Sequence, residues 1–142
     1  MDVKLLQAGD EAVLARVAEG VFDNAVDPAL AAEFLADPRH HIAVAVEDGA
    51  VVGFASGVHY VHPDKKAQLF VNEVGVAPSH HRQGIGKQVL RLLLEEGRRL
   101  GCSEAWVGTE PDNAPARALY VALGGSDGIG PFVGYAWDFE ES

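Results

Sequence analysis

The stretch 74–87 constrains the fold more than any other part of the sequence. It opens with apolar residues typical of a strand end and continues through two glycines, Gly84 and Gly86. From 85 to about 100, apolar residues recur every three or four positions, which predicts a helix with one buried face. Gly101 is a typical residue for the end of such a helix. We therefore expect a strand, a glycine turn and a long helix in direct succession.

The start of that helix is chemically suited to bind an anion. First-turn N–H groups have no partner within a helix, and the helix dipole places partial positive charge there. Gly84 and Gly86 lack a β-carbon, so that phosphate oxygens can approach the main chain, and Arg82 and Lys87 add positive charge. In a chain of net charge −10 this positive cluster stands out. The spacing matches neither a P-loop nor a complete dinucleotide fingerprint, which argues against nucleotide hydrolases and dehydrogenases.

The rest of the chain reads as strands first and alternating strands and helices later. Asp48-Gly49 predicts a hairpin turn, and Asp27-Pro28 predicts a helix start. This order favours a mixed, largely antiparallel sheet with helices packed on it, and the 142 residues are expected to form one domain, 1–142. The expected strands are 3–7, 42–46, 51–60, 68–76, 104–109 and 130–138, and the expected helices are one or two within 10–37, then 85–100 and 114–123.

Composition limits the partners. The net charge of −10 disfavours nucleic acid and favours cationic ligands. No apolar run reaches the roughly 18 residues that a membrane span needs, and the single Cys102 forms no internal disulfide, so a cytoplasmic protein without membrane contact is expected. Histidines 40 and 41, like histidines 80 and 81, are adjacent residues whose side chains point in different directions. No cysteine or carboxylate completes a ligand set, so no metal is expected.

Two motifs make the chain similar to the GNAT acetyltransferases. The run His81-Arg82-Gln83-Gly84-Ile85-Gly86 resembles the family turn Gln/Arg-x-x-Gly-x-Gly/Ala, from which only position 81 departs. Asn113, Ala116 and Tyr120 match a second family element, Asn-x-x-Ala-x-x-x-Tyr. The resemblance implies an α/β (α+β) fold whose mixed, mostly antiparallel central sheet has six or seven strands, with about four helices packed on both faces. It also implies a homodimer, and a sheet that splays after its fourth strand to admit the pantetheine arm of acetyl-CoA.

The same resemblance implies which residues hold the cofactor. The turn would bind the pyrophosphate of acetyl-CoA mainly through main-chain N–H groups, and the neighbouring strand end and the second motif would contact the pantetheine arm. The implied cofactor-binding residues are Val74, Gly75, Val76, His81, Arg82, Gln83, Gly84, Ile85, Gly86, Lys87, Asn113, Ala116 and Tyr120.

Acetyl transfer to an amine needs an unprotonated amine, a donor for the developing oxyanion and a proton for the departing thiolate. Glu73 is the candidate base, and the main-chain N–H near Val74 is the candidate oxyanion donor. Tyr120 is the candidate acid. Each has an alternative: Glu73 as a solvated strand carboxylate, Tyr120 as a core residue, and Asn113 as a helix N-cap. A covalent route through Cys102 is disfavoured, since an isolated cysteine near a helix end is more often packing material.

The acceptor is suggested by a closer resemblance. The segments 59–63, 69–76 and 80–85 look like the small aminoglycoside 3-N-acetyltransferases of the GNAT class, which favours the 3-amine of a cationic aminoglycoside. Alternatives are a GNAT that acts on a polyamine, a peptide N-terminus or a metabolite, and a non-catalytic acyl-CoA-binding sensor. The candidate substrate-binding carboxylates are Asp23, Asp27, Glu73, Glu110, Asp112 and Asp138.

Overall fold

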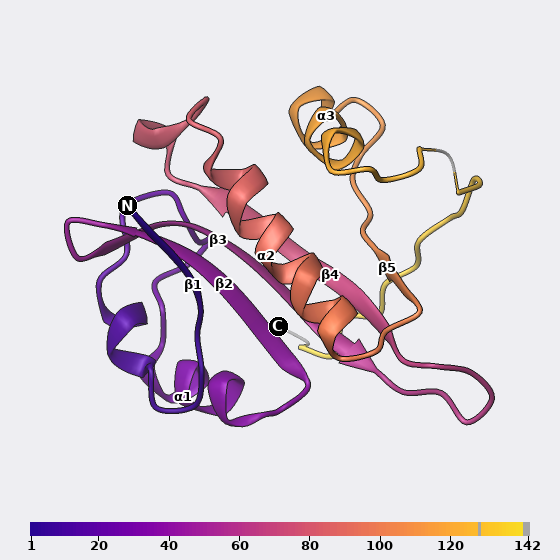
Figure 1. The fold of residues 1–142 in the computed structure, drawn as a ribbon, viewed down its shortest axis with the longest axis horizontal. Helices are drawn as coiled ribbons and strands as arrows, with labels where there is room; N and C mark the ends of the chain where they lie inside the picture. Colours follow the sequence, from indigo (N-terminus) through magenta and orange to yellow (C-terminus); the bar gives the residue numbers. More distant parts are fainter. Residues whose placement is uncertain (128, 141–142) are drawn as a thin grey trace. The chain divides into compact units, whose positions relative to one another are not determined.

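A computed structural model describes residues 1–127 and 129–140 of the chain. It contains two compact units, Met1–Gly108 and Thr109–Ser142, which are described separately. The first holds a five-stranded sheet in the order β1-β2-β3-β4-β5 (Figure 1). Its elements are β1 Asp2–Leu5, the 3₁₀ helix η1 Glu11–Ala15, α1 Pro28–Ala36, β2 His40–Glu47, β3 Ala50–Tyr60, β4 Gln68–Val76, the 3₁₀ helix η2 Pro78–His80, α2 Ile85–Arg99 and β5 Glu104–Trp106. The second unit holds α3 Ala114–Ala122.

The expected fold class is confirmed. β1 to β4 form an antiparallel meander, and β5 pairs with β4 in parallel, which makes the sheet mixed. The described residues form five strands and three α-helices, fewer than the six or seven strands and four helices expected. Residues 130–138 contain no strand. Pro131 offers no N–H for a ladder and Gly130 has a φ of 119°, and both weaken a strand at this point.

The hairpin between β2 and β3 follows directly from its turn residues. Asp48 and Gly49 have φ values of 52° and 77°, so both central residues are left-handed, as a two-residue type I′ turn requires. Glu47 and Ala50 pair directly across this turn. The predicted hairpin is therefore confirmed at the predicted residues.

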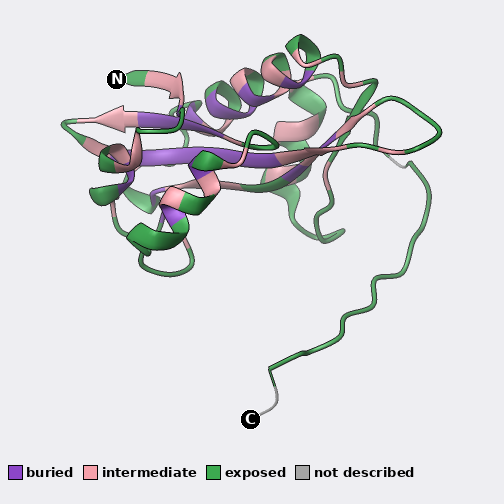
Figure 2. Ribbon diagram, turned by 90° about the horizontal axis from the view of Figure 1, so that it is seen from below, coloured by how far each residue is buried: buried purple, intermediate pink, exposed green. Residues whose placement is uncertain are grey.

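Helices cover both faces of the sheet in the first unit. α2 lies on one face, and η1 and α1 lie on the other (Figure 2). On the α2 face, Val89 and Leu93 are fully buried, and Gly97 lets the helix approach Leu69 so closely that a β-carbon on Gly97 would lie 2.9 Å from Leu69 Cδ2. On the other face, Phe22 stacks on Phe54 with ring centroids 4.1 Å apart.

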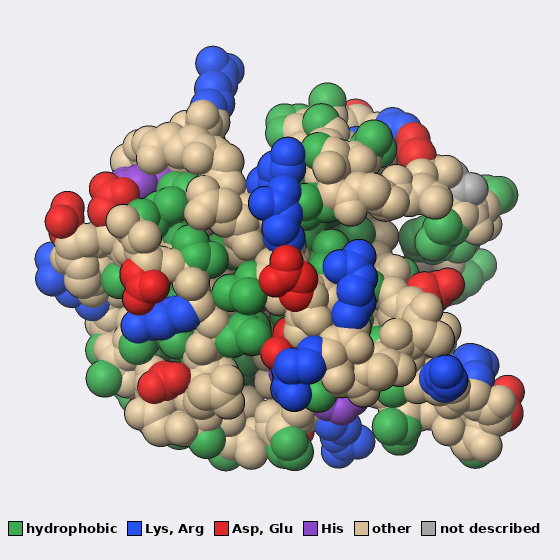
Figure 3. Space-filling view, viewed as in Figure 1, with side chains coloured by type: hydrophobic (Ala, Val, Ile, Leu, Met, Phe, Trp, Pro, Cys, Tyr) green, Lys and Arg blue, Asp and Glu red, His purple; other side chains and the backbone are tan. Residues whose placement is uncertain are grey.

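The outer side of α2 is strongly polar. Arg91, Glu95 and Arg98 are exposed on it, and Figure 3 shows basic and acidic side chains interspersed over this face of the molecule. The buried and exposed residues alternate with the three-to-four spacing read from the sequence.

None of the helices in the described part of the chain combines the length and the apolar character needed to cross a membrane.

Candidate active site

A one-residue bulge divides β4. Across the ladder to β3, Gly57 pairs with Val71, and the preceding β3 residue, Ser56, pairs with Glu73. Asn72 is therefore an extra residue on β4. Neither glycine nor proline marks this position, so that local composition gives no sign of the bulge. The extra residue decides which face of the sheet the following side chains point to.

The two halves of β4 direct their odd-numbered side chains to opposite faces. Before the bulge, Leu69 packs on α2 against Gly97. After the bulge, a β-carbon on Gly75 would meet the main-chain oxygen of Val21, which belongs to the N-terminal segment on the opposite face. Because side chains alternate along a strand, Glu73 points to the same face as Gly75. The Glu73 carboxylate thus lies on the face covered by the N-terminal segment.

The second half of β4 has a free edge. β5 pairs only with Gln68–Phe70, so within the described residues no strand covers the rest of β4 on that side. The Ala77 N–H donates to the main-chain oxygen of Val52 in β3 at 2.9 Å. Since alternate residues of an antiparallel strand direct their main-chain groups to opposite sides, the N–H groups of Val74 and Val76 face the free edge. They are available to an extended ligand lying along β4.

The N-terminus of α2 follows this edge after eight residues, 77–84. Gly84 is the N-cap residue, with a left-handed φ of 75°, and no side chain caps the helix. In the part of the chain that the structure describes, no group accepts a hydrogen bond from the N–H of Ile85, Gly86 or Lys87. Together with the helix dipole, these N–H groups form a site for an anion.

The structure brings the predicted residues of the strand end and of the glycine turn together along one path. Ile85 is buried, so it offers only its main chain to a ligand, while the side chains of Arg82 and Lys87 are exposed. Arg82 has a φ of 65°, an uncommon left-handed conformation for a non-glycine residue. The residues on this path are Val74, Gly75 and Val76 on β4, His81, Arg82, Gln83 and Gly84 in the turn, and Ile85, Gly86 and Lys87 in the first turn of α2.

Glu73 stands beside the free edge without a fixed partner. Its side chain is exposed, and among the described residues it forms neither a salt bridge nor a side-chain hydrogen bond. It adjoins Val74, whose N–H faces the free edge. An available carboxylate and an available N–H donor are therefore adjacent in the chain at the point where β4 leaves β5.

A pocket of about 690 Å³ lies within the N-terminal segment 11–31, on the same face as Glu73. Its lining includes apolar residues such as Phe22 and three carboxylates, Glu11, Glu19 and Asp23. Asp23 was among the predicted substrate carboxylates. Glu11 at the start of η1 and Glu19 were not, because neither has a distinctive spacing in the sequence. Asp27 caps α1, as the sequence predicted, since its Oδ1 accepts a hydrogen bond from Ala29 N–H at 2.8 Å, and its role toward a substrate stays a prediction.

The second unit carries the remaining predicted residues. Asn113 caps α3, since its Oδ1 accepts from Ala116 N–H at 3.2 Å, as the capping alternative anticipated. Tyr120 is half-buried, and this burial raises the pKa of its phenol above the ordinary value of 10.0. A raised pKa keeps the phenol protonated, as a proton donor must be. Three predicted carboxylates are exposed in this unit: Glu110, Asp112 and Asp138.

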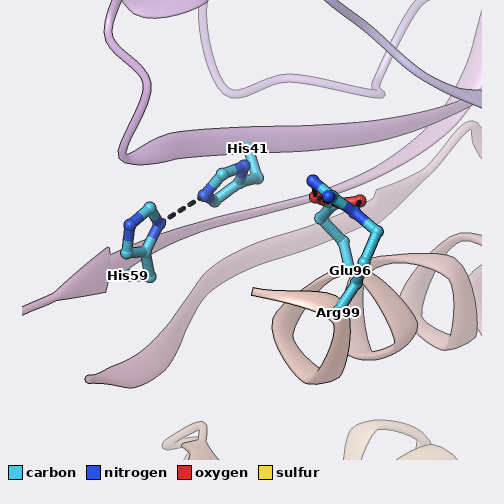
Figure 4. A network of polar contacts seen from close by, with 4 residues as sticks. All are labelled: His41, His59, Glu96 and Arg99. Carbon is cyan, nitrogen blue, oxygen red and sulfur yellow. Dashed lines mark hydrogen bonds and ion pairs between the residues drawn. The ribbon is translucent and has the colours of Figure 1, made fainter. Parts of the chain in front are cut away.

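A separate polar cluster lies under the C-terminal end of α2. His41 Nε2 and His59 Nδ1 are 2.7 Å apart, with Glu96 and Arg99 of α2 beside them (Figure 4). Burial and the neighbouring His59 lower the pKa of His41, and the bond from Arg99 lowers the pKa of Glu96. Among the described residues, no three His, Cys, Asp or Glu side chains are placed to hold a metal ion.

Cys102 does not resemble a nucleophile. It is half-buried, and this burial raises the pKa of its thiol, which disfavours the thiolate. The half-buried position agrees with the packing role expected from the sequence. The candidate ligand-binding features of the first unit are the free edge of β4, the uncapped α2 N-terminus and the N-terminal pocket.

A strand with a free edge and an uncapped helix start are thus found in one unit, and the chain can be compared with known proteins. The profile described as "Acetyltransferase (GNAT) family" matches residues 13–124. The chain therefore belongs to the GNAT acetyltransferase family.

Its relatives act on several small amines, judged by their names. The L-2,4-diaminobutyric acid acetyltransferase of Virgibacillus pantothenticus is 34% identical over 80 residues, which cover 56% of this chain and 49% of that protein. An aminoglycoside N(6')-acetyltransferase type 1 of Salmonella typhimurium is 31% identical over 85 residues, or 57% of this chain and 59% of that one. The matches thus span about half of each curated relative.

A solved structure extends the likeness in fold to nearly the whole chain. The aminoglycoside acetyltransferase AAC(6')-Iy, in complex with a bisubstrate analogue of CoA and acetylneamine, superposes with a TM-score of 0.77. The match covers 96% of this chain and 97% of that chain at 22% identity, and at that identity it establishes the fold alone. The named aminoglycoside relatives carry a 6'-designation and not the 3-N designation that the sequence resemblance suggested.

Proposed function

We propose that this protein transfers an acetyl group from acetyl-CoA to an amine of an aminoglycoside. The observation that carries the proposal is the free edge of β4, which leads within eight residues, 77–84, to the uncapped N-terminus of α2. A strand edge suits the amide-bearing pantetheine arm, and a helix N-terminus suits the pyrophosphate. Acetyl-CoA carries both groups on one molecule.

The residues that would hold acetyl-CoA are main-chain donors for the most part. The N–H groups of Val74 and Val76 would bind the pantetheine arm, and those of Ile85, Gly86 and Lys87 would bind the pyrophosphate. The bound thioester supplies an activated acetyl group. The space beside the Gly84 α-carbon is open, since nothing lies within 4 Å of the point that a β-carbon would occupy.

The chemistry then falls to three groups of the chain. The Glu73 carboxylate takes a proton from the attacking amine, directly or through one water molecule. The Val74 N–H stabilises negative charge on the carbonyl oxygen of the thioester. The Tyr120 phenol, held protonated by its raised pKa, donates a proton to the departing thiolate. Asn113 and Ala116 belong to the same helix motif as Tyr120.

The acceptor would approach Glu73 from the face that carries the N-terminal segment. The pocket there presents three carboxylates, Glu11, Glu19 and Asp23, over an apolar lining. Such a surface complements a ligand with several ammonium groups and apolar ring faces, as an aminoglycoside has. Two relatives named for aminoglycosides, one of them solved with an acetylneamine-bearing analogue, support this acceptor class.

The test is release of free thiol from acetyl-CoA with a panel of aminoglycosides, spermidine, 2,4-diaminobutyrate and short peptides. Turnover on aminoglycosides is the expected result, and NMR of the product locates the acetyl group. The 3-amine is the first position to examine, on the strength of the residues shared with the 3-N enzymes, and the 6'-amine is the second, from the names of the relatives.

Other outcomes would revise the proposal at different levels. Turnover on 2,4-diaminobutyrate or spermidine alone would keep the reaction and remove the antibiotic acceptor. Binding of CoA without turnover on any amine would indicate a sensor. Light scattering would test the expected homodimer independently of activity.

A further inference from the structure

His81 stands at the one position where the glycine turn departs from the family motif, and its side chain reaches back to β4. Its Nε2 lies 3.0 Å from the main-chain oxygen of Val76. Val76 is the last residue of β4, and its main-chain groups face the free edge. His81 therefore links the turn that precedes α2 to the edge of β4.

The bond to His81 agrees with the orientation of Val76 deduced from the ladder. The Ala77 N–H donates to Val52 of β3, so the carbonyl of the preceding residue, Val76, must point away from β3. His81 contacts this carbonyl on the free-edge side of β4. A carbonyl oxygen can only accept, so Nε2 of His81 must carry the proton. The bond does not involve Nδ1, which lies on the other side of the ring.

Other contacts of the turn lead away from this edge. His80 Nε2 lies 3.2 Å from Glu47 Oε1 at the end of β2. On the opposite side, a β-carbon on Gly20 would lie 2.7 Å from Pro78 Cδ, so the proline ring rests on the N-terminal segment. Those contacts fix the turn to the body of the unit. The contact of His81 fixes it to the strand edge that would bind the pantetheine arm.

We infer that His81 is a positioning residue that sets the spacing between the two halves of the CoA site. The inference rests on the proposed function. His81 holds the Val76 edge and the Gly84 turn in one arrangement, so that a ligand spanning both meets both sets of N–H donors at once. A ligand that occupies only one half gains nothing from this link.

The experiment compares two variants against three ligands. His81→Gln keeps a side-chain N–H at the place of Nε2, whereas His81→Leu keeps bulk and removes the donor. The ligands are CoA, which spans both halves, ADP, which carries the pyrophosphate alone, and pantetheine, which carries the arm alone. Dissociation constants come from calorimetry for CoA and from ligand NMR titration for the fragments. His40→Leu, an exposed histidine at the start of β2, is the matched control.

In the His81→Leu variant we expect CoA to bind about threefold to tenfold more weakly, the loss of one hydrogen bond, while ADP and pantetheine change less than about twofold. The His81→Gln variant and the His40→Leu control should bind all three like the parent protein. Long-range proton–nitrogen NMR should show the proton of His81 on Nε2.

Distinct results would overturn the inference. Equal CoA binding by His81→Leu and the parent would show that the bond from His81 to Val76 does not contribute to CoA binding. A loss of ADP binding that parallels the loss of CoA binding would indicate that His81 contacts the phosphate directly. A His81→Gln variant as weak as His81→Leu, or a ring whose only proton is on Nδ1, would exclude the donor role. Failure of the parent protein to bind CoA would instead refute the proposed function. Unfolding temperatures of all variants identify any loss of folding.

Discussion

The main-chain oxygen of Val21 lies 2.5 Å from the point that a β-carbon would occupy on Gly75. No side chain fits between the two. Glycine at position 75 therefore allows the loop before α1 to lie directly on β4, one residue beyond Val74. This contact holds the loop, whose neighbouring residues Gly20 and Phe22 line the pocket, against the edge of β4 that we propose binds acetyl-CoA.

The first prediction follows from that contact. The Gly75→Ala change forces the Val21 loop off β4, and such overpacking costs about 1–3 kcal/mol of unfolding free energy. Urea denaturation measures the loss. Gly134→Ala is the control, because a β-carbon there meets nothing within 4 Å. If Gly75→Ala is as stable as the control, the loop does not pack on β4 as described.

The second prediction concerns the Glu73 carboxylate. Glu73→Gln removes the proton acceptor and keeps the size of the side chain, so kcat should fall about 100-fold. The CoA dissociation constant should stay the same, because Glu73 lies on the face covered by the N-terminal segment, where we propose that the acceptor binds. Steady-state kinetics and calorimetry measure the two, with Glu95→Gln on the exposed side of α2 as the control. An unchanged kcat would remove Glu73 from the mechanism.

The third prediction concerns Tyr120. Tyr120→Phe removes the proton donor and should lower kcat at least about 100-fold with CoA as the leaving group. A better leaving group needs less help, so the defect should shrink with an acetyl donor whose thiol is more acidic, such as acetyl-thionitrobenzoate. Rates with both donors are the measurement. Equal defects with the two donors would contradict proton donation to the thiolate.

The fourth prediction separates two roles of Asp27. Its carboxylate caps α1 by bonding Ala29 N–H. Asp27→Ala should therefore lose about 1 kcal/mol of stability, whereas Asp27→Ser, which can still cap, should lose little. If capping is the whole role, Asp27→Ser also keeps the KM for the aminoglycoside. A raised KM in a stable Asp27→Ser variant would give Asp27 the substrate-binding role first expected of it.

The fifth prediction is a pH dependence of stability that arises at His41. Burial and His59 lower the pKa of folded His41 below its ordinary 6.5, so the unfolded chain takes up the proton first as the pH falls. The stability contributed by neutral His41 is complete above about pH 6.5 and is lost as the pH falls through the folded pKa.

Two other groups facing this cluster titrate lower. The pKa of Glu96 and that of Asp37 are both lowered, from 4.5 and 3.8, so their losses begin at more acidic pH. Urea denaturation between pH 7 and pH 5 should therefore show a shallower decline in His41→Gln than in the parent. His62→Gln, at a histidine that bonds Gln68 and is not among the groups that shift the pKa of His41, should follow the parent curve. Identical slopes in all three proteins would place the pH dependence elsewhere.

Much of the fold follows from local residues. The bounds of β4 and the first residue of α2 are those predicted, because alternating and three-to-four hydrophobic patterns are local properties. The Asp48-Gly49 hairpin follows from the backbone freedom of its two residues. The glycine turn before α2 was recognised for the same reason, since glycines before an amphipathic helix are visible in the sequence, and its binding of phosphate stays a prediction.

The parts that could not be predicted depend on partners distant in the chain. The bulge at Asn72 arises from the register with β3, and nothing in its neighbours announces it. The approach of Val21 to Gly75 joins residues more than 50 positions apart. The strand expected at 130–138 is absent from the structure. The apolar residues of this segment indicate what it could bury, but they do not supply a strand beside it.

The bulge also has a meaning for changes in chain length. With Asn72 deleted, Val71 would still pair with Gly57 and Glu73 with Ser56, so the ladder would become regular and Glu73 would keep its present face. An extra or missing residue inside either regular half of β4 would instead turn the side chains beyond it to the opposite face. The bulge is therefore the place along this strand where the chain can lose a residue without changing which side chains lie on which face.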